Sequence, residues 1–146
     1  MIASSSLDGT IMIWDASLSS FGKQIKELNG HKGLIKGVAW DPRGQYLASQ
    51  SEDKSVIFWR TSDWKIEGTL KQPFQGTAGS SFFHRLSWSP DGEHIIATNA
   101  LNSKHHIAPV IKRGSWETQF DYVGHLGPIV VSVIFFFPLP RKYNFF

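Results

Sequence analysis

Three residue types that could do chemistry lie close together in the chain. His31 is followed by Ser49 and Asp53, so a base, a nucleophile and an orienting carboxylate are present, as in a hydrolase triad. The sequence around them has no Gly-x-Ser-x-Gly nucleophile elbow and no visible oxyanion donor. The triad interpretation is therefore weak, and the role of these residues depends on the elements that hold them.

The adjacent His105 and His106 could suggest a metal site. Neighbouring residues on a strand point to opposite faces, and no carboxylate or third histidine follows at ligand spacing. We expect a solvated turn here. The chain has 0 Cys, which excludes a disulfide framework and a cysteine-based zinc or redox site. The sequence predicts no metal, no other cofactor and no small-molecule substrate.

An internal repeat predicts the elements that position these residues. IASSSLDGTIMIWD (2–15) shares its layout with LASQSEDKSVIFWR (47–60), and VAWDPRGQYLAS (38–49) shares its layout with LSWSPDGEHIIA (86–97). A period of roughly 45 residues with Gly-His and Trp-Asp signatures is typical of WD40 blades, each a four-stranded antiparallel sheet. DPRG and SPDG suit type I turns between strands. No window shows sustained helical periodicity, so we predict an all-β fold.

The repeat predicts a partial propeller over residues 1–131. Its blades are expected at about 1–28, 29–72 and 80–122, with a fourth starting from 124. Propellers need about four to eight blades to close. About three blades leave the ring open, so we expect a piece of a longer protein or a truncated product. The apolar tail 132–146 does not continue a blade.

In a WD repeat, a buried hydrogen-bonded tetrad ties three strands and a loop together, and all its polar groups are paired. Its members are a histidine of the Gly-His loop, a serine of the second strand, a turn aspartate and a tryptophan of the third strand. In the second blade they are His31, Ser49, Asp53 and Trp59. This structural interpretation is stronger than the catalytic one.

The other two blades depart from this set. The first has Ser4, Asp8 and Trp14, but its histidine would precede Met1. The third has Ala97 where the serine is expected and lacks the tryptophan. We therefore expect packing alone to hold the third blade and to leave it the least rigid.

The rim of the central channel is the candidate partner-binding surface. It is formed by the start of each innermost strand and the residue before each turn aspartate. The candidates are Leu34, Lys36, Glu52, Leu7, Phe82 and His84. Exposed apolar and charged side chains together suit protein recognition. Trp116 is expected to pack in the core or at a blade edge, with a partner contact as the alternative.

Three stretches resemble the HIRA/Hir histone chaperones: LNGHKGLIKGVAWDPRGQYLASQSEDKSVIFWRTSDWKIEGTLKQPF (28–74), RLSWSPDGEHIIATNALN (85–102) and GSWETQFDYVGH (114–125). The resemblance runs from about residue 2 to about 131, within that family's N-terminal propeller. It implies a non-enzymatic scaffold for replication-independent nucleosome assembly and transcriptional regulation in the nucleus. The implied partners are a ubinuclein-type subunit and, indirectly through the complex, histones on chromatin.

Two alternatives stay open. One is the propeller subunit of the replication-coupled chromatin assembly factor, although VIFWRTSDW and FDYVGH favour the HIRA side. The other is a truncated, non-functional isoform. The net charge of +3 tolerates an anionic partner, but without a basic run the case for direct nucleic-acid binding is weak. IVVSVIFFFPLP (129–140) is too short to span a bilayer, so no membrane contact is expected.

Overall fold

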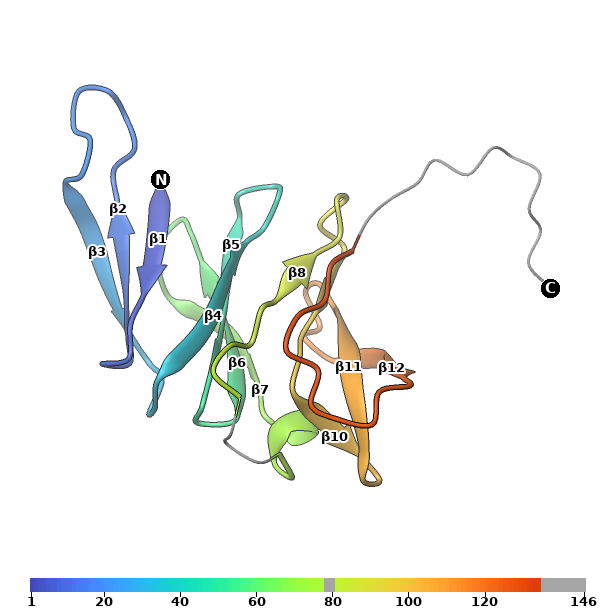
Figure 1. The fold of residues 1–146 in the computed structure, drawn as a ribbon. Coiled ribbons are helices and arrows are strands. Elements are labelled where there is room, and N and C mark those ends of the chain that lie inside the picture. Colours follow the sequence, from blue (N-terminus) through green and yellow to red (C-terminus); the bar gives the residue numbers. More distant parts are fainter. Residues whose placement is uncertain (78–80, 135–146) are drawn as a thin grey trace, which may run out of the picture.

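The computed structural model describes residues 1–77 and 81–134. They form three antiparallel β-sheets that lie side by side in chain order, from left to right in Figure 1, without closing into a ring. The all-β prediction is confirmed: the only helical element in these residues is a short 3-10 turn, η1 (Gln72–Phe74). No helix in the described part of the chain is long and apolar enough to cross a membrane.

The first sheet has three strands. They are β1 (Ile2–Ser5), β2 (Thr10–Trp14) and β3 (Gln24–Asn29), in that order. Gly9 in the first turn has a φ of +86°, a left-handed value that glycine adopts without steric cost. Among the described residues no strand pairs with the free edge of β1.

The second sheet has four strands. They are β4 (Ile35–Trp40), β5 (Tyr46–Ser51), β6 (Ser55–Arg60) and β7 (Ile66–Leu70), in that order. Successive side chains of a strand face opposite sides, so this sheet joins two cores. Leu47, Ile57 and Trp59 pack with the first sheet, and Ala48, Val56 and Phe58 pack with the third.

The third sheet is more irregular than the sequence predicts. Its strands are β8 (Ser87–Trp88), β9 (His94–Ile96), β10 (Ala100–Asn102), β11 (His105–Lys112) and β12 (Thr118–Val123). The long β11 pairs with β9, β10 and β12. Asn99 has a φ of +53°, and this left-handed residue separates β9 from β10.

The segment after β12 runs back along the inner edge of the third sheet (Figure 1). The sequence suggested the innermost strand of a fourth blade from 124, but residues 124–134 form no strand, and Val131 makes only an isolated parallel bridge to Arg85. Arg85 N donates to Val130 O at 3.1 Å, and Asn99 N donates to Ile129 O at 2.8 Å. Residues 135–146, most of the apolar tail, lie outside the described residues.

The second and third sheets meet backbone to backbone at their inner strands. His84 N donates to Lys36 O at 3.1 Å. A β-carbon at Gly37 would lie 1.8 Å from the carbonyl oxygen of His84, so only glycine fits at this position.

Candidate functional site

A chain of hydrogen bonds joins the four tetrad residues of the second sheet. Trp59 Nε1 donates to Ser49 Oγ at 2.8 Å. Ser49 Oγ lies 2.8 Å from His31 Nε2, and His31 Nδ1 lies 2.9 Å from Asp53 Oδ2. The bonds therefore connect the loop before β4 with β5, β6 and the turn between them.

The protonation states fit this geometry. Burial lowers the pKa of His31, against the opposing effect of Asp53. Burial would raise the pKa of Asp53, but hydrogen bonds from Ser55, Lys32 N and His31 outweigh it and lower that pKa. A neutral His31 then donates from Nδ1 to the carboxylate and accepts the Ser49 hydroxyl proton at Nε2.

This arrangement supports structure and not nucleophilic chemistry. Ser49 is 0% exposed and Trp59 is buried against the first sheet, so a substrate has no path to the Ser49 hydroxyl. Gly30 explains the residue type before the histidine: a β-carbon there would lie 2.6 Å from Trp59 Cη2. Gly30 thus lets the loop pack against the indole of Trp59, and His31 bonds the serine that accepts the indole proton.

The first sheet holds part of the same network. Trp14 Nε1 donates to Ser4 Oγ at 2.8 Å. Asp8 Oδ1 accepts from Thr10 N at 2.9 Å and from Thr10 Oγ1 at 2.7 Å. In the described residues no histidine bonds to Ser4 or Asp8.

The third sheet fills the equivalent positions with hydrocarbon. Ala97 takes the position of Ser49. Ile111 takes the position of Trp59: it lies opposite Ile95 as Trp59 lies opposite Leu47. Ala97, Ile107 and Ile111 are all buried in the core shared with the second sheet.

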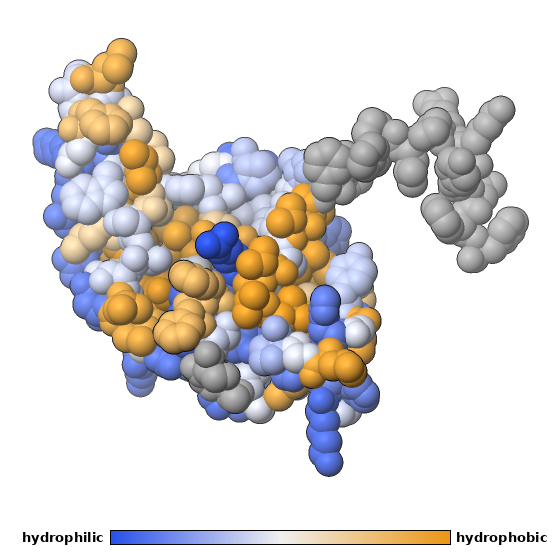
Figure 2. Space-filling view, viewed as in Figure 1, coloured by the Kyte–Doolittle hydropathy of each residue, from blue (hydrophilic) through white to orange (hydrophobic). Residues whose placement is uncertain are grey.

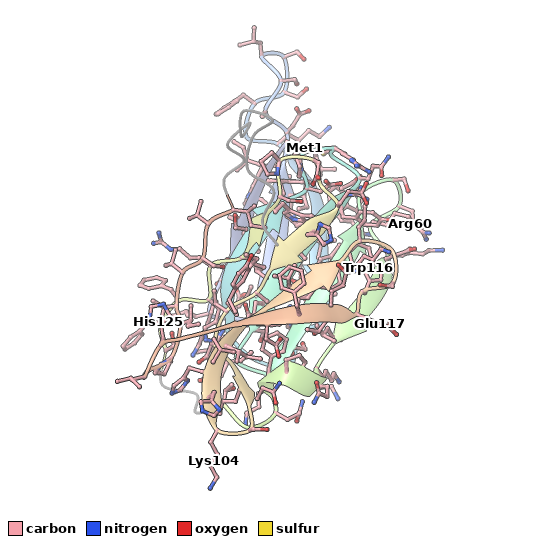
Figure 3. The ribbon with its side chains drawn as sticks, turned by 90° about the vertical axis from the view of Figure 1, so that its right-hand side faces the viewer. Met1, Arg60, Lys104, Trp116, Glu117 and His125 are labelled. Atoms are coloured by element: carbon pink, nitrogen blue, oxygen red, sulfur yellow. The ribbon has the colours of Figure 1, made fainter. Side chains whose placement is uncertain are left out.

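Trp64 and Trp116 occupy matching turns of the second and third sheets, before β7 and β12. Their φ values of +59° and +55° are strained for bulky residues. The packing of the indoles accounts for this. Trp116 stacks on Phe58 with ring centroids 4.1 Å apart, and it lies within the molecule beside β12 (Figure 3). A β-carbon at Gly68 would lie 2.5 Å from Trp116 Cδ1, so Trp116 packs onto the second sheet.

The role of Trp64 was missed from the sequence. Trp64 packs in the core of the first and second sheets, edge-on to Trp40 at 6.1 Å. The similar segments RTSDWK and KRGSWE, which begin at the last residues of β6 and β11, were the signal that the sequence offered.

A buried ion pair between the second and third sheets was also missed. Arg113 Nη2 donates to Asp41 Oδ2 at 2.7 Å, and Nη1 donates to Gly92 O at 2.8 Å. Burial would raise the pKa of Asp41, but Arg113 and the N–H groups of Arg43 and Gln45 outweigh it and lower that pKa. The partners belong to different repeats, so spacing within one repeat gave no sign of the pair.

Four of the six rim candidates reach the surface. Leu7 and Phe82 are largely exposed, and Leu34 and Glu52 are partly exposed. They come from all three sheets or the segments that enter them. Together they offer apolar contacts and one carboxylate.

Lys36 and His84 are instead largely buried. Lys36 Nζ donates to Ser81 O at 2.7 Å and to Glu52 Oε1 at 3.4 Å. His84 Nε2 lies 3.0 Å from Asn99 Nδ2, and its Nδ1 is buried without a partner. Burial and the charge of Lys36 lower the pKa of His84 to about 4, against the pull of Glu52. The imidazole is therefore neutral at pH 7.

His105 and His106 begin β11, where His105 is exposed and His106 is half-buried. Lys104, at the tip of the same hairpin, projects away from the sheet (Figure 3). In the part of the chain that the structure describes, no group of three or more His, Asp or Glu side chains could hold a metal ion.

Comparison with known proteins places the repeat in a family. Residues 1–15 and 22–60 match the WD domain, G-beta repeat family. Protein HIR1 of Cryptococcus neoformans var. neoformans serotype D is 45% identical over 141 residues, covering 94% of this chain and 16% of that protein. Protein hir1 of Schizosaccharomyces pombe is 37% identical over 132 residues, covering 90% of this chain and 14% of that protein.

A third relative, the histone transcription regulator slm9 of Schizosaccharomyces pombe, is 40% identical over 107 residues, covering 73% of this chain and 13% of that protein. The chain therefore spans no more than 16% of the length of these three relatives. Over that span it carries WD40 repeats, and the chain belongs to the HIRA/Hir family of WD40-repeat proteins.

Proposed function

We propose that this chain is a non-enzymatic protein-interaction scaffold, part of the propeller of a HIRA-like histone chaperone complex. Its setting is the nucleus, in replication-independent nucleosome assembly and transcriptional regulation. One relative is named a histone transcription regulator, which supports a role near histone genes or chromatin. The observation that carries the scaffold proposal is the tetrad. Ser49 is buried and already bonded to His31 and Trp59, so its hydroxyl contributes rigidity and not turnover.

The surface proposed for partner binding is the exposed part of the rim. Leu7 and Phe82 present apolar area, and Glu52 adds a partly exposed carboxylate that pairs with Lys36. Apolar anchors with a polar border are typical of protein interfaces. Lys36 and His84 are left out of this surface because they are buried. The partner proposed here is a ubinuclein-type subunit, through which histones are reached indirectly.

Binding to an immobilised ubinuclein-type subunit tests the proposal. We expect Phe82→Ala to weaken binding by about tenfold, the loss typical of an anchor side chain at an interface. Phe21→Ala is the matched control, since Phe21 is also an exposed phenylalanine but lies in the connection between β2 and β3. The large subunit of the replication-coupled chromatin assembly factor forms the second arm. Binding only to that subunit, or equal binding by both variants, would contradict the proposal.

A further inference from the structure

A small groove lies on the face of the second sheet that is turned toward the first. It has a volume of about 150 Å³ and is lined by the loop before β4, the turn between β5 and β6, and side chains of β6 and β7. Its residues fall between positions 30 and 71, and the second sheet packs against a neighbouring sheet on both faces. The groove therefore belongs to the middle of the described structure.

The floor of the groove is hydrocarbon. Ile57 is buried there, and Ile66, on β7, is 47% exposed. A β-carbon at Gly30 would lie 3.2 Å from Ile66 Cδ1, so the loop before β4 packs closely beside this side chain. An aliphatic stem placed on Ile66 would remove its exposed surface from water, which is favourable.

Lysines border this floor. Lys32 and Lys71 line the groove and are exposed, and in the part of the chain that the structure describes neither ammonium group pairs with a carboxylate. Lys26 on β3 lies opposite Ile13, on the same face as Leu28, which packs toward the second sheet. Figure 2 shows hydrophilic surface along β3, at the left border of the molecule. The groove thus faces ammonium groups that attract an anion.

The carboxylate in the groove, Asp53, offers no free acceptor to a cation. Its Oδ2 accepts from Lys32 N at 2.8 Å and lies 2.9 Å from His31 Nδ1. Its Oδ1 accepts from Ser55 N at 3.0 Å and from Ser55 Oγ at 2.6 Å. These donors use the acceptor positions of both carboxylate oxygens, so the lysines determine which charge the groove prefers.

The outer strand β7 offers a backbone edge beside the groove. β7 pairs with β6, and among the described residues no strand lies on its other side. The carboxylates of β7 and of the turn before it, Glu67 and Asp63, both pair with Arg60, so their charge is largely offset. An extended peptide that adds to such an edge gains main-chain hydrogen bonds, and a pocket beside the strand selects one of its side chains.

We propose that this groove binds an extended acidic segment of a partner protein. The segment runs beside β7 and lays the stem of a glutamate on Ile66, with the carboxylate between Lys32 and Lys71. A glutamate fits better than a phosphate group, because phosphate favours the bidentate fork of arginine, and among the described residues no arginine lines the groove.

Fluorescence anisotropy of a labelled short peptide of alternating glutamate and leucine, titrated with the 146-residue chain, tests the proposal. We expect Lys71→Gln to raise the dissociation constant about threefold, and Lys32→Gln combined with it about tenfold, because exposed ion pairs contribute modestly. Lys104→Gln is the matched control, since it removes the same charge at the tip of a distant hairpin (Figure 3). Absence of binding by the unaltered chain, or equal effects of Lys71→Gln and Lys104→Gln, overturns the proposal.

Exchanging the charges gives a second readout. The variant with both Lys32→Glu and Lys71→Glu should bind a peptide of alternating lysine and leucine about tenfold more tightly than the glutamate peptide. If this variant keeps its preference for the glutamate peptide, the groove is not the binding site. A phosphoserine and leucine peptide that binds the unaltered chain about tenfold more tightly than the glutamate peptide would overturn the choice of a carboxylate.

The groove and the rim can be tested separately. Phe82 does not line the groove, so we expect Phe82→Ala to leave binding of the glutamate peptide unchanged. A failure of the rim to bind a ubinuclein-type subunit is then distinguishable from a failure of the groove to bind the peptide. Loss of peptide binding in Phe82→Ala would place the acidic peptide at the rim and overturn the proposal.

Discussion

The second and third sheets fill equivalent positions with opposite chemistry. In the second, Ser49 and Trp59 belong to a polar network that His31 and Asp53 complete. In the third, hydrocarbon occupies the same places, and Trp116 reaches back to cover Phe58. Both sheets therefore have a filled interior at these positions, and where polar side chains occupy them, the polar groups are paired. A particular network is only one way to meet that requirement.

The largest effect is expected from removing the turn tryptophan of the third sheet. Trp116→Ala deletes a buried indole that stacks on Phe58, and we expect a loss of about 3–5 kcal/mol in the free energy of unfolding. Trp64→Ala should cost less, since Trp64 is only partly buried. Urea denaturation followed by circular dichroism measures both. A loss below about 1 kcal/mol at Trp116 would mean that packing does not hold the third sheet.

Acid should weaken the boundary between these two sheets through His84. Its folded pKa of about 4 lies below the ordinary 6.5, so the unfolded chain binds the proton first. The contribution of His84 to stability is fully present above pH 6.5. As the pH falls from there to about 4, the folding equilibrium constant drops by at most tenfold per pH unit through this residue.

The urea midpoint measured from pH 7.5 to 4 tests this dependence. His84→Asn should flatten the part of the curve due to this residue, while the part due to His31, whose pKa is also lowered, remains. Lys36 and Glu52 are the charged groups that face His84. An unchanged curve in His84→Asn would assign the acid sensitivity to another group.

Exchanging serine and alanine at the equivalent positions 49 and 97 compares the polar and the apolar interior directly. Ser49→Ala leaves His31 Nε2 and Trp59 Nε1 each without a partner, and we expect a loss of about 1–3 kcal/mol in the free energy of unfolding. Ala97→Ser buries a hydroxyl among hydrocarbon, with an expected loss of about 1–3 kcal/mol. Thermal and urea unfolding of both variants give the values. If either change left the free energy of unfolding unaltered, the serine of the second sheet and the alanine of the third would be interchangeable at that position.

The smallest effect is expected in the first sheet. Trp14→Phe removes the bond to Ser4 where water can replace it, so we expect a change within about 0.5 kcal/mol. Trp59→Phe breaks the matching bond in a buried setting and should cost about 1–2 kcal/mol. The difference between the two urea midpoints measures how much burial contributes to this bond. Equal losses would show that the bond from Trp14 to Ser4 is as protected from water as the bond from Trp59 to Ser49.

The sequence was sufficient for the fold class because turns and two-residue alternation are local signals. They give the strand positions of Ser49 and Trp59. They give no view across repeats, so the pair of Arg113 and Asp41 and the burial of Lys36 and His84 were missed.

Gly37 and Trp116 together determine the angle between the second and third sheets. At the inner strands Gly37 has no side chain, so the backbones of the second and third sheets touch. Toward the outer strand β7, the Trp116 indole lies between the sheets and packs against Gly68. A fixed narrow side and a fixed wide side define a pitch, and the pitch determines how many blades complete a circle. Blade number is thus a property that one methyl group or one ring could alter.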